Sequence, residues 1–335
     1  MSKIKIGVLS FAHSHARGYL RALKTLENVS ILTADPGNPN GADFAIELGV
    51  EYVDSYDEFF AWNPEAVVVC SENTRHRTHV EMCAAAGAHV LCEKPLATTV
   101  NDCEAMIRAC ETSGVTLMVA YPMRCTPMFK QLRLDVEDGK LGQIISAVGT
   151  NNGRIPGGWF TRSDLSGGGA IIDHLVHCSD LLNILLAPAR PQSVYAVSNT
   201  IIQDPNNPVD DETGAIVLIT YSSGVTAMID CSWSQPINAP TWGGLTLELI
   251  GVDRSVMIDP FALRIEGFSQ KDKQPIWLPF ISESTLSLLQ EFLSCIADGR
   301  TPEADGPAGL SAVELVEAAV LSTKTGTPIQ LRGEA

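Results

Sequence analysis

The chain has 335 residues, of which 45% are hydrophobic and 19% charged, a composition typical of a soluble protein long enough for two domains. Its 39 acidic and 23 basic residues give a formal net charge of −16, which argues against nucleic acid or an anionic membrane surface as a partner. The sequence contains no run of eighteen apolar residues, so we expect no transmembrane helix. The first residues lead directly into a predicted strand and show no signal-peptide pattern.

The cysteines favour a reducing compartment. There are nine, an odd number, and none forms a C-x-x-C pair. Several stand inside apolar runs, where a reduced thiol behaves as a small hydrophobic group. We therefore expect free thiols and a cytoplasmic protein.

The first 120 residues alternate between short apolar runs and amphipathic helical patterns. This alternation predicts a doubly wound parallel sheet of the Rossmann type, whose strands are buried on both faces. Ligands of such sheets bind outside the carboxyl ends of the strands. The expected strands are Ile4–Leu9, Val29–Ala34, Ala66–Cys70, His89–Cys92 and Thr116–Ala120.

After about residue 122 the pattern changes to neighbouring strands with a few helices. This grouping predicts an α+β domain with a largely antiparallel open sheet over residues 123–335, following a dinucleotide-binding domain over residues 1–122. The expected helices are Met128–Val136, Ala170–Leu186, Thr285–Ala297 and Ala308–Lys324. The expected strands are Ile144–Thr150, Gln192–Thr200, Gly214–Tyr221, Thr226–Ser232, Leu245–Ile250 and Ser255–Ile258.

The turn after the first strand is the expected place for a phosphate-binding glycine motif, G-x-G-x-x-G. Here Ser10, Ala12 and His15 stand in the three glycine positions, so the motif itself is absent. The helix N-terminus that follows still offers free N–H groups to a phosphate. The candidate cofactor-binding residues of this turn are Ser10, Phe11, Ala12 and His13. Alternatively, His13 and His15 are loop residues without a role in binding.

The second strand ends at Asp35, about 25 residues beyond Ser10. A carboxylate there accepts hydrogen bonds from the adenosine ribose and repels a 2′-phosphate. The stretch Pro36–Val50 contains no Lys or Arg that could receive such a phosphate. These features favour NAD over NADP, although an exposed aspartate in a turn is the alternative.

Glu93-Lys94-Pro95 follows the strand His89–Cys92, at the edge where the sheet's ligand is expected. Oxidation of a carbinol requires a base for the hydroxyl proton, and a lysine whose pKa is lowered by desolvation can serve. The alternative is a solvated Lys–Glu pair at a strand end.

A glycine run, Gly167–Gly169, precedes the longest apolar helix pattern of the second half. In that helix Asp173 and His177 are four residues apart and share one face. Glycines permit close approach of another backbone or of a cofactor. The pair is a candidate catalytic site or a buried structural pair.

In combination and in order, these features resemble the Gfo/Idh/MocA oxidoreductases from end to end. The resemblance rests on Asp35, Ser71-Glu72-Asn73 with His76, Glu93-Lys94-Pro95, Arg124 with Pro127, G-G-G-x-x-x-Asp173-x-x-x-His177, and the closing segment Gly306–Gly326.

The resemblance implies an N-terminal domain that binds NAD and a C-terminal domain whose open sheet often forms oligomer contacts. Because an open sheet face exposes apolar surface unless another subunit covers it, we expect a homodimer or homotetramer. It implies that Lys94 is the acid/base, that Lys94–Pro95 is a cis peptide, and that Asp173 and His177 complete the catalytic set. By similarity, the residues along the cofactor are Ser71, Asn73, His76, Glu93 and Lys94. The residues near the substrate are Arg124, Trp159, Asp173 and His177.

The implied function is hydride transfer between NAD and a hydroxyl of a sugar, polyol or inositol. One alternative is an NAD-dependent glycosidase of the same fold, and another is a sensor without catalysis. A metal site is a third alternative, which would draw on His13, His15, Asp173, His174 and His177. We expect no metal, because hydride transfer with a lysine base needs no Lewis acid.

Overall fold

The computed structural model describes residues 3–204, 208–239, 241–260, 264–271, 273–279 and 284–331. It divides into two compact units. The first comprises Met1–Pro122, Arg162–Gly167 and Thr285–Glu314, and the second comprises Met123–Thr161, Gly168–Ser284 and Leu315–Ala335. Among the described residues no helix has both the length and the apolar character needed to cross a membrane.

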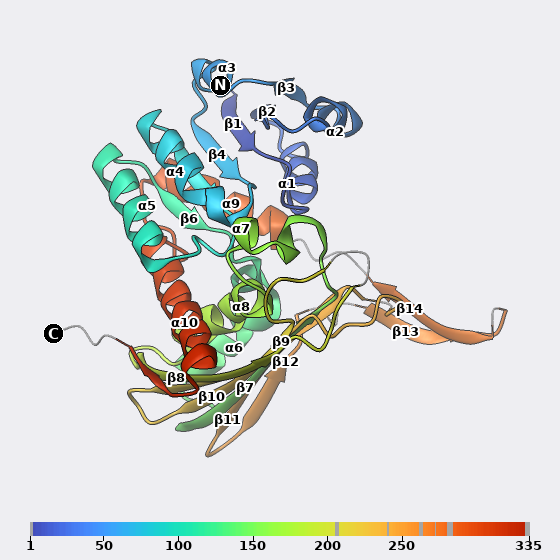
Figure 1. Ribbon diagram of the computed structural model, residues 1–335, viewed down its shortest axis with the longest axis vertical. Helices are drawn as coiled ribbons and strands as arrows, with labels where there is room; N and C mark the ends of the chain where they lie inside the picture. The colour runs from blue at the N-terminus through green and yellow to red at the C-terminus, as the bar shows by residue number, and fades with distance from the viewer. Residues whose placement is uncertain are drawn as a thin grey trace. The chain divides into compact units, whose positions relative to one another are not determined.

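The first unit contains a six-stranded parallel sheet in the order β3-β2-β1-β4-β5-β6 (Figure 1). Its strands are β1 (Ile4–Leu9), β2 (Val29–Ala34), β3 (Glu51–Val53), β4 (Ala66–Val69), β5 (His89–Cys92) and β6 (Leu117–Val119). The helices between them are α1 (Ala16–Leu23), α2 (Gly41–Leu48), α3 (Tyr56–Ala61), α4 (His76–Ala85) and α5 (Val100–Ser113), with the short η1 (Asn73–Arg75) before α4. The predicted doubly wound sheet is confirmed.

The strand order reverses between β1 and β4, which lie side by side in the sheet. Strand β4 reads as a continuous apolar run because both faces of the sheet are covered; all four of its residues are buried. Such a reversal leaves a crevice at the carboxyl ends of the two strands, where open parallel sheets bind their ligands.

Part of the chain after residue 122 returns to the first unit, in contrast to a simple division at that point. Helix α7 (Ser163–Ser166), most of α9 (Ser284–Asp298) and the first half of α10 (Gly306–Thr325) belong to it. The loop before α10 pairs with the edge strand β6: the Val119 amide donates to the carbonyl oxygen of Ala304 at 2.7 Å. This pairing between distant segments carries no local signal in the sequence.

The second unit is built on a seven-stranded sheet in the order β12-β11-β7-β10-β9-β8-β15. Within the described part of this sheet, β7 and β10 form a parallel pair and the other neighbours are antiparallel. The predicted α+β arrangement with a largely antiparallel sheet is confirmed. The strands are β7 (Ile144–Gly153), β8 (Pro191–Asn199), β9 (Gly214–Tyr221), β10 (Thr226–Ser232), β11 (Gly243–Gly251), β12 (Ser255–Ile258) and β15 (Ile329–Gln330), with a separate ribbon of β13 (Arg264–Ser269) and β14 (Gln274–Pro279).

Helix α8 (Ala170–Leu185) packs against β7, β9 and β10, and α6 (Pro127–Glu137) packs against α8 and β12; η2 (Pro122–Cys125) and η3 (Gly158–Thr161) are short 3₁₀ turns. Side chains along β9 alternate, with Val217 and Ile219 buried and Ile216 and Leu218 exposed. This alternation is expected for a sheet with one face covered by helices and one face open.

Candidate active site

The turn after β1 adopts its sharp bend without glycine. Ser10 has φ +69°, a left-handed conformation that non-glycine residues seldom take. Its hydroxyl oxygen accepts a hydrogen bond from the Ala12 amide at 3.2 Å, and its own amide donates to the carbonyl oxygen of Ala34. Serine thus takes the conformation of the motif's first glycine, supported by a local side-chain hydrogen bond.

Asp35, at the end of β2, is held toward this turn. Its Oδ2 accepts from the Phe11 amide at 2.9 Å and from Asn38 Nδ2 at 2.6 Å. Oδ1 makes no hydrogen bond to the described residues and is therefore available to a ribose hydroxyl. The Phe11 ring is buried and stacks on Phe44 at 4.4 Å, so the backbone of Phe11, rather than its ring, contributes to this corner.

Ser71 and Asn73 follow β4 and carry buried polar atoms that need a partner. Neither Ser71 Oγ nor Asn73 Oδ1 has a hydrogen-bond partner among the described residues, whereas Asn73 Nδ2 donates to the Ser166 carbonyl oxygen at 2.9 Å. Buried polar groups in folded proteins are normally satisfied. Two such atoms at the ligand-binding edge, together with Asp35 Oδ1, fit the hydroxyl and amide groups of a dinucleotide.

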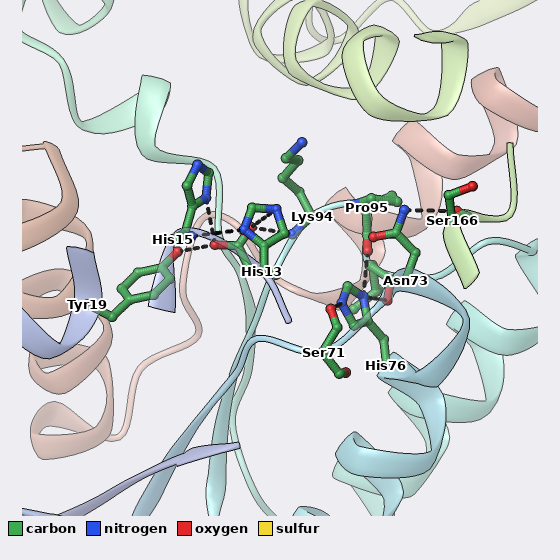
Figure 2. Close-up of polar contacts among 11 residues, drawn as sticks. His13, His15, Tyr19, Ser71, Asn73, His76, Lys94, Pro95 and Ser166 are labelled. Atoms are coloured by element: carbon green, nitrogen blue, oxygen red, sulfur yellow. Dashed lines mark hydrogen bonds and ion pairs between the residues drawn. The ribbon is translucent and has the colours of Figure 1, made fainter. Parts of the chain in front are cut away.

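His76 is fully buried, and its hydrogen bonds to the described residues all go to backbone carbonyl oxygens (Figure 2). Nδ1 lies 2.9 Å from the Pro95 oxygen, and Nε2 lies 3.1 Å from the Ser71 oxygen. Burial lowers the pKa of His76, and the hydrogen bonds to carbonyls only partly oppose that effect. The ring therefore fixes the loops after β4 and β5, and the cofactor contact predicted for His76 stays a prediction.

Lys94 lies at the carboxyl end of β5, and the Lys94–Pro95 peptide bond is cis, as the resemblance implied. Its side chain is buried and extends away from the end of the sheet (Figure 2). The Lys94 amide donates to Glu93 Oε2 at 3.1 Å. An amine in this position is at the edge where a ligand of the sheet binds.

His13, His15 and Glu93 form a compact cluster in which one atom of each lies within 4.8 Å of the others. The His15 amide donates to His13 Nδ1 at 3.2 Å, so a neutral His13 carries its proton on Nε2, the atom that faces Glu93. A metal ion at Nε2 would have to displace that proton onto a nitrogen that already accepts a hydrogen bond. The geometry favours an ion-pair cluster over a metal site, and the absence of a required metal stays a prediction.

In the second unit the glycine run permits the close backbone approach expected of it. A Cβ atom at Gly169 would lie 2.0 Å from the carbonyl oxygen of Glu212. That oxygen accepts from the Ala170 amide and the Glu212 carboxylate accepts from the Ile171 amide, both at 2.9 Å. Glu212 thereby satisfies two of the free N–H groups at the start of α8 and fixes the helix in place.

Asp173 is buried in α8, and its Oδ2 accepts a hydrogen bond from Trp233 Nε1 at 3.0 Å. His174 Nε2 also lies 3.2 Å from Oδ2, without hydrogen-bond geometry. Consecutive helical residues point about 100° apart, but the His174 imidazole is long enough to turn back toward Asp173.

His177 is the one residue between Ala170 and Leu182, all of them described, that is not fully buried. An imidazole that is partly exposed in this otherwise buried stretch of α8 can be reached by a substrate. The shared helix of Asp173 and His177 is as predicted. The catalytic set of Lys94 with these two residues draws on both units and stays a prediction.

Arg124 forms a buried bidentate ion pair with Asp180 of α8: Nε donates to Oδ2 at 2.8 Å, and Nη2 donates to Oδ1. Burial raises the pKa of Asp180, and the guanidinium opposes that rise. The ion pair anchors Arg124 to α8, and the substrate contact predicted for Arg124 stays a prediction. Trp159 is half-buried and stacks on Phe160 at 3.8 Å.

Sequence reasoning missed Tyr19 and Trp233, whose side chains donate to Glu93 and Asp173. Tyr19 stands 74 residues from Glu93, and Trp233 stands 60 residues from Asp173. In the sequence, Tyr19 looks like an ordinary apolar residue of a helix and Trp233 like one at the end of a strand. Only the tertiary contact shows that each donates a hydrogen bond to a buried carboxylate.

Comparison with known proteins agrees with this architecture. Residues 5–121 match a family model described as "Oxidoreductase family, NAD-binding Rossmann fold", and residues 129–256 match the "GFO/IDH/MocA C-terminal domain". The chain is 25% identical to D-apiose dehydrogenase of Paraburkholderia graminis, over 98% of this chain and 88% of that protein. It is 26% identical to myo-inositol 2-dehydrogenase of Thermotoga maritima, over 85% of this chain and 86% of that protein.

Among solved structures, GenD2 from gentamicin A biosynthesis, in complex with NAD, superposes with a TM-score of 0.89 at 23% identity, over 99% of this chain and 97% of that chain. This similarity supports the fold. Family models match both the parallel-sheet region and the open-sheet region of the chain, and the protein therefore belongs to the Gfo/Idh/MocA family of NAD-binding oxidoreductases.

Proposed function

We propose that the protein is an NAD-dependent dehydrogenase that acts on a hydroxyl of a sugar, polyol or inositol. The observation that carries the proposal is Lys94, a buried amine at the carboxyl end of β5, beside the residues that fit a dinucleotide. The names of the relatives, which act on apiose and myo-inositol, support this class of substrate.

The dinucleotide would be held by the Ser10–Ala12 turn, Asp35, Ser71 and Asn73. Asp35 favours NAD over NADP, because a 2′-phosphate would meet its carboxylate. Arg17 lies 4.2 Å from the Phe44 ring, but its guanidinium already pairs with Glu47, so it does not offer an uncommitted charge to that phosphate.

When bound, the nicotinamide supplies the hydride acceptor; the chain supplies proton transfer and orientation. Lys94 Nζ takes the proton of the reacting hydroxyl. His177 hydrogen-bonds the same hydroxyl or its neighbour and orients it. Asp173, held in place by the hydrogen bond from Trp233, places a negative charge on the same helix as the His177 imidazole. Trp159 presents an aromatic face to the substrate.

We further propose a homodimer or homotetramer formed through the open face of the sheet. Neighbouring strands place Val197 beside Ile216 and Leu218 beside Met228, and all four side chains are exposed on that face. A contiguous apolar patch of this kind is typical of a subunit interface. All nine cysteines are free and eight are buried, which supports a reducing, cytoplasmic location.

A panel of monosaccharides, inositols and sugar acids tests the substrate class, with NADH formation followed by absorbance. We expect one or a few related compounds to give steady NADH accumulation. A glycosidase that regenerates its NAD in each turnover would not accumulate NADH with a simple polyol, so that result would favour the alternative. Lys94→Ala serves as the control for turnover that depends on the site.

A further inference from the structure

His174 of α8 is a buried imidazole whose hydrogen-bonding capacity is unused. Neither Nδ1 nor Nε2 has a hydrogen-bond partner among the described residues, and the side chain is only 2% exposed, so solvent does not satisfy these atoms. Most buried polar atoms in folded proteins have a partner, and each exception calls for an explanation. His174 stands on the helix that carries the predicted catalytic pair, where a substrate can supply the partner.

The ring is fixed in place although its nitrogens are not satisfied. A Cβ atom at Gly153 of β7 would lie 3.0 Å from Cε1 of His174, so glycine leaves room for the ring at this point. Trp242 packs edge-on against it, with the ring centroids 6.1 Å apart and the planes at 81°. Asn151 Nδ2 donates to the backbone carbonyl oxygen of His174 at 3.1 Å and joins this turn of α8 to β7. A polar group that is held still before a ligand arrives loses little entropy on binding it.

The carboxylate of Asp173 decides which ring nitrogen of His174 offers an acceptor. Its Oδ2 lies 3.2 Å from Nε2 and is held by a hydrogen bond of 3.0 Å from Trp233 Nε1. The contact with Nε2 lacks hydrogen-bond geometry, but a ring proton is still more stable on the nitrogen that faces the negative charge. In a neutral imidazole the other nitrogen is then an acceptor. Nδ1 of His174 is therefore suited to accept a hydrogen bond from a hydroxyl group.

Asp173, His174 and His177 share one side of α8. Successive helical residues advance about 100° around the axis, so His177 lies about 40° from Asp173 and about 60° from His174. His177 thus stands between the other two in direction, one turn further along the helix, and it is the partly exposed member of the three. Side chains three residues apart on a helix are neighbours, with their Cβ atoms about 5–6 Å apart. A substrate that reaches His177 therefore has a second polar group beside it.

We propose that His174 is a specificity-determining residue, whose Nδ1 accepts a hydrogen bond from a second substrate hydroxyl on a carbon next to the one that is oxidised. This role rests on the proposed function, in which His177 orients the reacting hydroxyl or its neighbour. It narrows the substrate to sugars, polyols or inositols with adjacent hydroxyls. A site built to bind a hydroxyl rejects the analogue that lacks it, because a buried polar atom of the protein is then left unsatisfied.

Steady-state kinetics with NAD and matched pairs of compounds test this role. A pair consists of a parent and the analogue that lacks the hydroxyl on a neighbouring carbon: D-glucose with 2-deoxy-D-glucose, D-ribose with 2-deoxy-D-ribose, and myo-inositol with a deoxyinositol. Any other substrate of wild type is paired in the same way, with the hydroxyl on each neighbouring carbon removed in turn. For one of these hydroxyls, kcat/KM of the parent should exceed that of the analogue by about tenfold to a hundredfold.

Three substitutions of His174 separate recognition from structural support. His174→Leu removes the acceptor, so kcat/KM should fall for the parent but not for the deoxy analogue, and their ratio should approach about one. A purely structural role would lower both values equally and leave the ratio unchanged. His174→Asn places an amide oxygen near the position of Nδ1 and should restore much of the discrimination. His174→Gln, whose amide reaches toward the position of Nε2, should not restore it and gives a second measurement if His174→Leu does not fold.

Cys178→Ala is the matched control. Cys178 lies one turn beyond His174 on α8 and meets the same strand, where a Cβ atom at Gly149 would lie 3.3 Å from its Sγ. The substitution changes the packing of α8 against β7 but leaves the imidazole in place. We expect the ratio of parent to deoxy analogue to stay at the wild-type value in this variant.

The kinetic results distinguish failure of this role from failure of the proposed function. If wild type oxidises no sugar, polyol or inositol with NAD, the proposed function fails and the role of His174 fails with it. If wild type oxidises such a compound and all its neighbouring deoxy analogues equally well, the proposed function stands and the role of His174 is refuted. The same conclusion follows if His174→Leu keeps the discrimination of wild type.

Discussion

Replacing Arg124 by methionine should destabilise the protein strongly, because it leaves the carboxylate of Asp180 buried without its partner. The two side chains are 9% and 2% exposed, so solvent does little to screen the pair. Loss of one member of a buried ion pair costs about 3–5 kcal/mol. Urea denaturation of wild type and Arg124→Met, followed by circular dichroism, measures this difference.

The loss should depend on pH in a defined direction. Burial already raises the pKa of Asp180 in the folded protein, and removal of Arg124 raises it further. An acid whose folded pKa lies above its unfolded value favours folding below the unfolded pKa, and this contribution disappears as pH rises through the folded pKa. Arg124→Met should therefore be most unstable at about pH 8 and should recover part of its stability toward about pH 5.

The double variant Arg124→Met, Asp180→Leu distinguishes an anchoring role from a substrate contact. Replacing a buried ion pair by apolar groups is often neutral for stability, so we expect the double variant to recover stability and, with it, kcat/KM. A stable double variant with a greatly raised KM would instead support the substrate contact predicted for Arg124. A loss below about 1 kcal/mol in the single variant, or one independent of pH, would refute the reasoning about a buried pair.

Four further results are expected. Lys94→Ala should lower kcat about 10²–10⁴-fold while NAD still binds. Near-normal turnover in Lys94→Arg would show that His177, and not Lys94, takes the proton of the hydroxyl. NAD should bind at least about tenfold more tightly than NADP by calorimetry, and equal affinities would reject the role of Asp35. Dialysis against a chelator should leave activity unchanged, whereas a loss restored by zinc would contradict this. Light scattering should give a dimer or tetramer for wild type and a smaller species for Leu218→Glu; a wild-type monomer would count against the interface.

The amino-acid sequence determined most of the strands and helices, because apolar periodicity reports local burial directly. The runs Ile4–Leu9, Val29–Ala34 and His89–Cys92 coincide with β1, β2 and β5. Strand β3 was missed, since Glu51–Val53 is three residues long and contains no apolar run. The ribbon of β13 and β14 was missed as well.

The sequence also located Lys94, Asp35, Asp173 and His177 on the expected elements, because each follows a recognisable strand or glycine run. The partners of these side chains were decided only by the tertiary structure. Glu93 meets His15 across 78 residues of chain, and Arg124 meets Asp180 across 56. Periodicity describes which face of an element is buried, not which distant side chain it meets there. The charge on each buried group therefore depends on a contact that no local pattern specifies.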